Sequence, residues 1–135
     1  MPGYSGTPLA KKLGIKPGGT IIAVNAPKDY RALLSPLPAG VAFTVKPPKN
    51  GAAFIHLFVC SLAELDKALP GARRALKPDG MLWISWYKKS AKIPTDVTED
   101  LIRARILKMG LVDVKICAVS EIWSGLKCVV RKELR

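Results

Sequence analysis

Polar, cationic and aromatic side chains follow several predicted strands of this chain, at the point where each strand ends. These residues are Asn25, Lys28, Ser61, Tyr87, Lys88, Lys89, Trp123 and Ser124. In an open parallel sheet, ligands bind beyond the carboxyl ends of the strands, where diverging loops leave a crevice. Lysines donate charge-assisted hydrogen bonds to anions, and an indole offers a large apolar surface. We therefore predict a site for an anionic ligand here, bordered by residues 87–89 and 123–124.

Each of these residues also has a purely structural interpretation. Ser61 is a favourable helix N-cap, Asn25 is a typical turn residue, and Lys88 with Lys89 is typical of a solvated surface. The indole of Trp123 must be covered by the core, by a ligand or by a partner, because its apolar surface is large. The packing around each residue decides between the two interpretations.

The sequence contains no nucleophile, base and orienting group spaced as a recognisable catalytic set. The single histidine, His56, lies between Phe54 and Phe58 on a strand that we expect to be buried. A buried histidine with one hydrogen-bond partner is the expected arrangement there, rather than a catalytic base. We therefore predict no catalytic residues, and the pattern favours a protein that is not an enzyme.

The three cysteines, Cys60, Cys117 and Cys128, are far apart in the sequence. They lack the short paired spacing that builds a zinc site, and His56 has no spacing relation to them. We expect three reduced core thiols and no metal.

The chain is strongly basic, with 22 Lys and Arg against 10 Asp and Glu and a net charge of +12. Such an excess attracts phosphates, acidic proteins or anionic surfaces whatever the fold, and it is also the composition of a solvated basic surface. The partners that we expect are an anionic small molecule, a nucleic acid or an acidic protein.

Length and hydropathy predict a single domain over residues 1–135. A chain of 135 residues with 49% hydrophobic composition is long enough for one core and too short for two ordinary domains. No apolar run approaches the roughly 20 residues of a membrane-spanning helix, and residues 1–14 have no apolar signal core. We expect a cytoplasmic protein with no membrane partner.

The first half of the chain reads as short elements separated by proline and glycine. Apolar, partly β-branched runs predict three strands. Helical spacing predicts a turn of helix that Gly14 ends and a second helix that has Pro27 in its first turn and stops before Pro36. The predicted strands are residues 20–25, 41–45 and 54–59, and the predicted helical turn is residues 8–13.

The second half continues the alternation and then changes. Ser61 and Glu64 predict a capping box for a helix that reaches about residue 76 and is interrupted at Pro70 and Gly71. A turn at residues 77–80 precedes a strand at residues 81–87, which places Trp83 and Trp86 on opposite buried faces.

A last helix follows, capped by Thr95 or Thr98 and ended by Gly110. Its broad apolar stripe consists of Leu101, Ile102, Ala104, Ile106 and Leu107. Residues 112–119 and 126–131 then form two strands joined only by a loop, so they should pair antiparallel. This order predicts a three-layer α/β domain with a mostly parallel sheet of about six strands, helices on both faces and a C-terminal antiparallel hairpin.

Three segments carry a recognisable layout: residues 13–18 before the first strand, residues 75–82, and residues 110–112 together with 126–131. In these segments the chain resembles the methyltransferases that use S-adenosylmethionine. The resemblance spans nearly the whole chain and implies a Rossmann-like fold. More narrowly, residues 3–8, 94–100 and 123–126 resemble segments of a small bacterial protein family of unknown function.

The chain departs from the methyltransferase pattern where that family holds its cofactor. The family's first strand ends in a glycine-rich loop, whereas residues 25–28 here contain no glycine and include Pro27. The second strand should end in an acidic residue, whereas Val45 is followed by Lys46. Residues 47–53 are also too short for a further helix and strand. The resemblance is therefore to a truncated, degenerate methyltransferase fold, for which we expect no cofactor.

Fold resemblance without the site does not carry function. The leading hypothesis is a non-catalytic binding module that uses the carboxyl edge of its sheet to hold an anionic small molecule, a nucleic acid or an acidic protein. The first alternative is an S-adenosylmethionine-dependent methyltransferase with an atypical cofactor loop. The second is a structural or oligomerisation subunit whose hairpin edge pairs with another copy, as in a homodimer, or with another protein.

Overall fold

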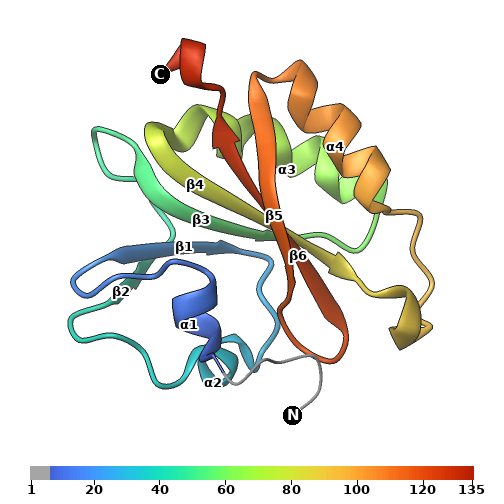
Figure 1. Cartoon of the computed structure of the whole chain (residues 1–135), viewed down its shortest axis with the longest axis horizontal. Helices are drawn as coiled ribbons and strands as arrows, with labels where there is room; N and C mark the ends of the chain where they lie inside the picture. Colours follow the sequence, from blue (N-terminus) through green and yellow to red (C-terminus); the bar gives the residue numbers. More distant parts are fainter. Residues whose placement is uncertain (1–6) are drawn as a thin grey trace.

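Apolar strands assemble into one six-stranded sheet in the order β2-β1-β3-β4-β6-β5 (Figure 1). The computed structural model describes residues 7–135. The first four strands, β1 (Thr20–Val24), β2 (Ala42–Thr44), β3 (Ala52–Phe58) and β4 (Leu76–Tyr87), are parallel. The last two, β5 (Leu111–Ala118) and β6 (Trp123–Val130), form an antiparallel hairpin in which β6 also pairs with β4. This topology confirms the predicted mostly parallel α/β sheet with its terminal hairpin.

Helices cover both faces of the sheet, as predicted. The longer helices α3 (Leu62–Ala75) and α4 (Glu99–Lys108) lie on one face, and the short helices α1 (Leu9–Lys12) and α2 (Tyr30–Leu34) lie on the other. Because strand side chains alternate between faces, β3 supplies Ile55 and Leu57 to the first core and Phe54 and Phe58 to the second. The central strand β3 is therefore apolar on both sides.

The start of α3 follows the predicted cap, with one difference. The Ser61 hydroxyl accepts a hydrogen bond from the Glu64 N–H at 3.1 Å, whereas the Glu64 carboxylate accepts from the N–H of Cys60 at 2.6 Å rather than from that of Ser61. The predicted interruption at Pro70 and Gly71 is wrong, because α3 runs through both residues to Ala75. Tertiary packing of its apolar side, including Leu65 and Leu69, outweighs the local helix-breaking tendency.

Thr98, and not Thr95, caps α4. Its hydroxyl accepts a hydrogen bond from the Leu101 N–H at 3.2 Å. The apolar stripe is narrower than predicted, since Ile102 and Ile106 are buried but Leu101 and Leu107 are exposed. A bidentate ion pair joins Arg105 to Asp66 and ties α4 to α3.

Several boundaries differ from the sequence-based expectation. The last strand, β6, begins at Trp123 and not at residue 126, so Trp123 and Ser124 are strand residues and not part of the hairpin loop. The helix predicted to contain Pro27 in its first turn begins only at Tyr30, and Pro27 instead accepts a turn hydrogen bond from the Tyr30 N–H at 3.0 Å. Residues 77–80 belong to β4 as an irregular insertion, because the pairing with β3 shifts between Ala52 and Phe54. Between these paired positions, the single residue Ala53 of β3 is opposite residues 77–80 of β4, so the predicted turn residues bulge out of the strand.

The cysteines occupy three different environments. Cys128 is buried, and burial raises the pKa of its thiol to about 12. Cys117 is half-buried, and burial also raises its pKa. Cys60 is exposed, so the prediction of three core thiols is wrong for this residue.

Several further features concern the edges and the ends of the chain. The strands β2 and β5 form the two edges of the sheet, and a register shift between Asp113 and Lys115 interrupts the pairing along β5.

Within residues 7–135, every helix is too short or too polar to cross a bilayer. Residues 3–6, which belong to the resemblance noted above, lie outside the described residues.

Two glycines allow a matched test of the packing. A Cβ at Gly125 would lie 2.9 Å from Val119 Cγ2 and 3.2 Å from Trp83 Cε3, whereas a Cβ at Gly71 would meet nothing closer than 3.8 Å. Gly125→Ala should lower the free energy of unfolding by about 1–3 kcal/mol through overpacking. Gly71→Ala should raise it by up to about 1 kcal/mol, because glycine weakens a helix interior. Urea unfolding of both variants checks this, and equal effects would contradict the packing described here.

Candidate functional site

The register of β4 and β6 brings two predicted loop segments together at the carboxyl edge of the sheet. Tyr87 pairs with Trp123, and Trp86 pairs with Ser124. Just beyond them, the Lys88 N–H donates to the Ile122 carbonyl at 2.9 Å. The chain leaving β4 and the chain entering β6 are therefore neighbours.

A cavity of about 970 Å³ lies beside this junction. We call it the β4–α4 pocket. The sheet contributes Trp86, Ser124 and Ile116 to it, from the face that α3 and α4 cover. The segment after β4 forms one wall, through residues 87–95, and the start of α4 forms the other, through residues 97–100. The pocket thus has an apolar floor and two polar walls.

The wall after β4 is cationic. It includes Lys89, the first residue of the short 3-10 turn η1 (Lys89–Ala91), and the two residues that flank this turn, Lys88 and Lys92. Within residues 7–135, no acidic side chain pairs with any of the three ammonium groups. Lys92 has a φ of 55°, a left-handed conformation that is uncommon outside glycine. This tight reversal keeps the three lysines within one short turn.

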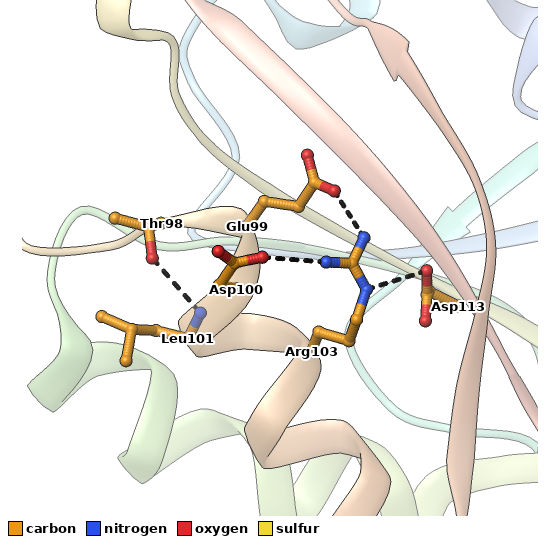
Figure 2. Close-up of polar contacts among 6 residues, drawn as sticks. All are labelled: Thr98, Glu99, Asp100, Leu101, Arg103 and Asp113. Atoms are coloured by element: carbon orange, nitrogen blue, oxygen red, sulfur yellow. Dashed lines mark hydrogen bonds and ion pairs between the residues drawn. The ribbon is translucent and has the colours of Figure 1, made fainter.

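The opposite wall carries carboxylates, but Arg103 compensates them (Figure 2). Its guanidinium contacts Glu99, reaches Asp100 at 3.1 Å, and reaches Asp113 of β5 at 3.1 Å. Hydrogen bonds to Glu99 and Asp113 raise the pKa of Arg103, so the group stays charged. The acids of this wall are thereby partnered within the chain, and the lysines across the pocket are not.

Polar contacts hold the wall after β4 against the turn between β3 and α3. The Thr95 hydroxyl donates to the Cys60 carbonyl at 2.7 Å. The Asp96 carboxylate accepts from the Leu62 N–H at 2.8 Å, and the Cys60 thiol donates to the Tyr87 hydroxyl at 3.3 Å. The pocket wall is therefore attached at both ends of the segment.

The structure separates the predicted site residues into two groups. Tyr87, Lys88, Lys89 and Ser124 line the β4–α4 pocket. The others do not: Asn25 and Lys28 lie in the turn after β1, and Ser61 caps α3.

Trp123 does not line the pocket, so the prediction that it borders the site is wrong, and its indole is covered by the core. Its side chain is only 5% exposed and belongs to the core under α1 and α2. The indole stacks on Tyr87 with centroids 4.5 Å apart and meets the edge of Phe58 at 5.0 Å. Its N–H is buried with no hydrogen-bond partner among the described residues.

Trp86 is the aromatic residue of the pocket, and the sequence-based prediction placed it only in the core. It is 7% exposed and packs in the α3 and α4 core while still reaching the pocket. The alternation of side chains along a strand could have indicated this position, because Trp86 must lie on the face of the sheet opposite to that of Tyr87. The sequence alone did not show that Trp86 pairs with Ser124. It also did not show that Lys92, Thr98 and Glu99 line the same pocket.

His56 is buried away from the pocket and has two hydrogen-bond partners where one was expected. Its Nδ1 lies 2.8 Å from the Tyr30 hydroxyl, and its Nε2 lies 2.7 Å from the Ser85 hydroxyl. The ring also stacks on Phe58 at 4.2 Å. Burial lowers the pKa of His56 to about 3, so the ring stays neutral and links three elements of the core.

The strand ends that hold S-adenosylmethionine in the methyltransferases do not fit that cofactor here. Asn25 adopts a φ of 58° at the end of β1, so a side chain stands where the family has glycine, and Pro27 lacks an N–H. After β2 comes Val45, which is 85% exposed, and then Lys46. Residues 45–49, which follow β2, therefore include no carboxylate for ribose hydroxyls.

The next turn along the sheet is closed as well. After β3, the Cys60 carbonyl and the Leu62 N–H are already bound by Thr95 and Asp96. These backbone groups are therefore engaged by the chain itself rather than free for a ligand. Within the part of the chain that the structure describes, no three His, Cys, Asp or Glu side chains are placed to share a metal ion.

Solved methyltransferases share this fold. A SAM-dependent methyltransferase from Aquifex aeolicus matches with a TM-score of 0.65 and 19% identity, over 89% of this chain and 86% of that one. A putative type 11 methyltransferase from Sulfolobus solfataricus matches with 0.62 and 12%, over 98% and 95%. A ribosomal protein L11 methylase from Lactobacillus delbrueckii subsp. bulgaricus matches with 0.55 and 12%, over 91% and 75%.

These likenesses show the fold alone, because the identities are low. No protein-family model and no curated protein matches the chain. The methyltransferase-like, Rossmann-like fold predicted from the layout of the sequence is confirmed.

The buried histidine makes stability depend on pH in a defined direction. The pKa of His56 is about 3 in the folded chain and 6.5 when exposed, so only the unfolded chain takes up its proton as the pH falls. Stability should be complete above pH 6.5 and decline below it, with a slope approaching about 1.4 kcal/mol per pH unit. Urea unfolding between pH 7 and about 5 measures this, in a range where most carboxylates stay ionised. His56→Gln should lack that slope, and identical pH profiles would refute the assignment.

Proposed function

We propose that the protein is a binding module whose β4–α4 pocket holds a small organic anion with an apolar body. One observation carries the proposal. Among the described residues, 7–135, Lys88, Lys89 and Lys92 on one wall of the pocket have no acidic partner, while Arg103 compensates the acids of the other wall. The local field therefore favours an anionic group near the lysines.

The lining supports a ligand with two chemically different parts. Trp86, Ile116 and Val97 offer apolar surface, on which a ring or aliphatic body would be covered from water. The hydroxyls of Ser90 and Ser124 stand at the same pocket and can orient polar groups. Mostly apolar lining with a few convergent polar groups is typical of small-molecule sites.

A small ligand is favoured over an extended polyanion at this pocket. The three lysines lie within five consecutive residues, and Glu99 and Asp100 lie on the facing wall. A long phosphate backbone would have to pass those carboxylates, whereas a compact anion need only reach the lysines. A cavity of about 970 Å³ also accommodates a whole small molecule.

Methyl transfer is the second candidate, and the shared fold with solved methyltransferases is what favours it. The residues after β1 and β2 speak against it, as described above. S-adenosylhomocysteine, added to the protein in a thermal unfolding assay, should leave Tm unchanged, because a ligand raises Tm only if it binds the native state. A saturable rise in Tm would support the methyltransferase alternative and contradict the account of Asn25 and Val45.

The anion pocket predicts a specific pattern of ligand binding. 1-Naphthyl phosphate joins an aromatic body to an anionic group, and it should raise Tm in a saturable way. 1-Naphthol lacks the charge and inorganic phosphate lacks the body, so each should give a smaller rise. Lys88→Ala with Lys89→Ala should weaken 1-naphthyl phosphate at least about tenfold, while leaving the unfolding free energy within about 0.5 kcal/mol.

A charge-matched variant controls for the overall field of the protein. Lys11→Ala with Lys16→Ala removes two exposed lysines from α1 and the turn after it, which do not line the pocket. This variant should bind 1-naphthyl phosphate almost as the unmodified protein does. Equal weakening in the two double variants would mean that net charge, and not the pocket, attracts the ligand.

A further inference from the structure

A second group of cations lies at the end of the sheet opposite to the β4–α4 pocket, where β4 and β5 begin and β6 ends. Three segments contribute: the last turn of α3, the last turn of α4, and the C-terminal segment with its short 3-10 turn η2 (Lys132–Leu134) (Figure 1). Apart from Arg105, which pairs with Asp66, their cationic residues are Arg73, Arg74, Lys108, Arg131, Lys132 and Arg135. We call this surface the basic pole.

Direct contacts bring the three segments together. The Arg73 guanidinium donates through Nε to the Met109 carbonyl at 2.8 Å, which joins the ends of α3 and α4. The Arg131 N–H donates to the Gly110 carbonyl at 2.9 Å. Leu134 packs so closely on Gly110 that a Cβ there would lie 2.6 Å from its Cδ1. The basic pole is therefore one surface and not a set of separated charges.

Few acidic residues oppose the charge of this surface. Glu133 pairs with Arg131 at 3.5 Å, Asp66 pairs with Arg105, and Asp79 lies in the irregular first part of β4. Arg74, Lys108 and Lys132 are exposed, and within residues 7–135 their side chains have no acidic partner. Cations stabilise helix C-termini, but that effect concerns only the ends of α3 and α4. In the C-terminal segment, Arg131 pairs with Glu133 and Arg135 donates through Nε to the Val130 carbonyl at 2.8 Å, whereas no such contact accounts for Lys132.

The composition of the basic pole fits phosphate groups. Four of its members are arginines, whose planar guanidinium binds phosphate oxygens in a bidentate way. A hollow of about 440 Å³, lined by Pro70, Arg73, Arg74 and Met109, lies between the two helix ends. A phosphate in it would meet two guanidinium groups at once.

We propose that the basic pole binds the phosphate backbone of a nucleic acid duplex, without regard to its sequence. The surface spans three segments, so it can follow successive phosphates, in contrast to the compact lysine wall of the β4–α4 pocket. No aromatic residue belongs to the three segments, so base stacking adds nothing to binding. Affinity comes from released counterions and must fall steeply with salt.

Fluorescence anisotropy with a labelled DNA duplex of about 20 base pairs tests the proposal at about 0.05–0.2 M NaCl. The variant Arg74→Ala with Lys108→Ala and Lys132→Ala should bind at least about tenfold more weakly and lose roughly two to three units of the slope of log K against log salt. An RNA duplex of the same sequence should behave alike, because both backbones present phosphates. Circular dichroism checks that the variant is folded.

A triple variant of equal net charge is the control: Lys11→Ala with Lys16→Ala and Lys46→Ala, three exposed lysines outside the basic pole. It should weaken the duplex less than about threefold and keep most of the salt slope. Equal losses in the two triple variants, or no duplex binding by the unmodified protein, would overturn the proposal. Competition by polyglutamate as strong as that by unlabelled duplex would assign the surface to acidic proteins instead. None of these outcomes affects the β4–α4 pocket, whose test uses different residues.

Discussion

The two-sided burial of β4 is the constraint on which the rest of the structure depends. Alternation sends Trp83 to one core and Trp86 to the other, and both are buried. Trp83 donates its indole N–H to the Leu13 carbonyl at 2.9 Å, which fastens the end of α1 to the sheet. Together with Val119, Trp83 leaves no room for a Cβ at Gly125 of the neighbouring strand β6. Trp86, on the opposite face, helps to form the floor of the β4–α4 pocket. One strand therefore sets both the core and the candidate site.

The distribution of charge follows from how the acids are used inside the chain. Glu64 and Asp96 bind backbone N–H groups around the turn after β3, and Glu99, Asp100 and Asp113 share Arg103. Acids engaged locally cannot balance lysines elsewhere, so the net charge of +12 appears at surfaces without partners. The composition predicts an anionic partner. The local use of the acids leaves exposed cations at the lysine wall of the β4–α4 pocket and at the basic pole, and also at other positions such as Lys11, Lys16 and Lys46.

Periodicity and capping chemistry predicted most of the fold from the sequence. The strands, the Ser61 cap and the terminal hairpin depend on local patterns of two, three and four residues, which a sequence displays directly. Pro70 did not break α3, because the tertiary burial of Leu65 and Leu69 is invisible locally. The site was only partly predictable for the same reason. The rule that ligands bind beyond strand ends identified Lys88 and Lys89. It did not show that Trp86, and not Trp123, lines the pocket, because this depends on which face of the hairpin packs on α1 and α2.

A methyltransferase fold does not require a methyltransferase site. The fold places strand ends at one edge, and that edge remains the place where loops diverge. In this chain the end of β2 carries Val45 and Lys46 where a ribose would need a carboxylate, and Thr95 with Asp96 closes the turn after β3. The same loop that closes this turn then forms the cationic wall of the β4–α4 pocket. Residues 87–98 therefore do two things: they close the turn after β3, and they form the cationic wall of the β4–α4 pocket. A ligand at this edge would therefore bind between β4 and α4.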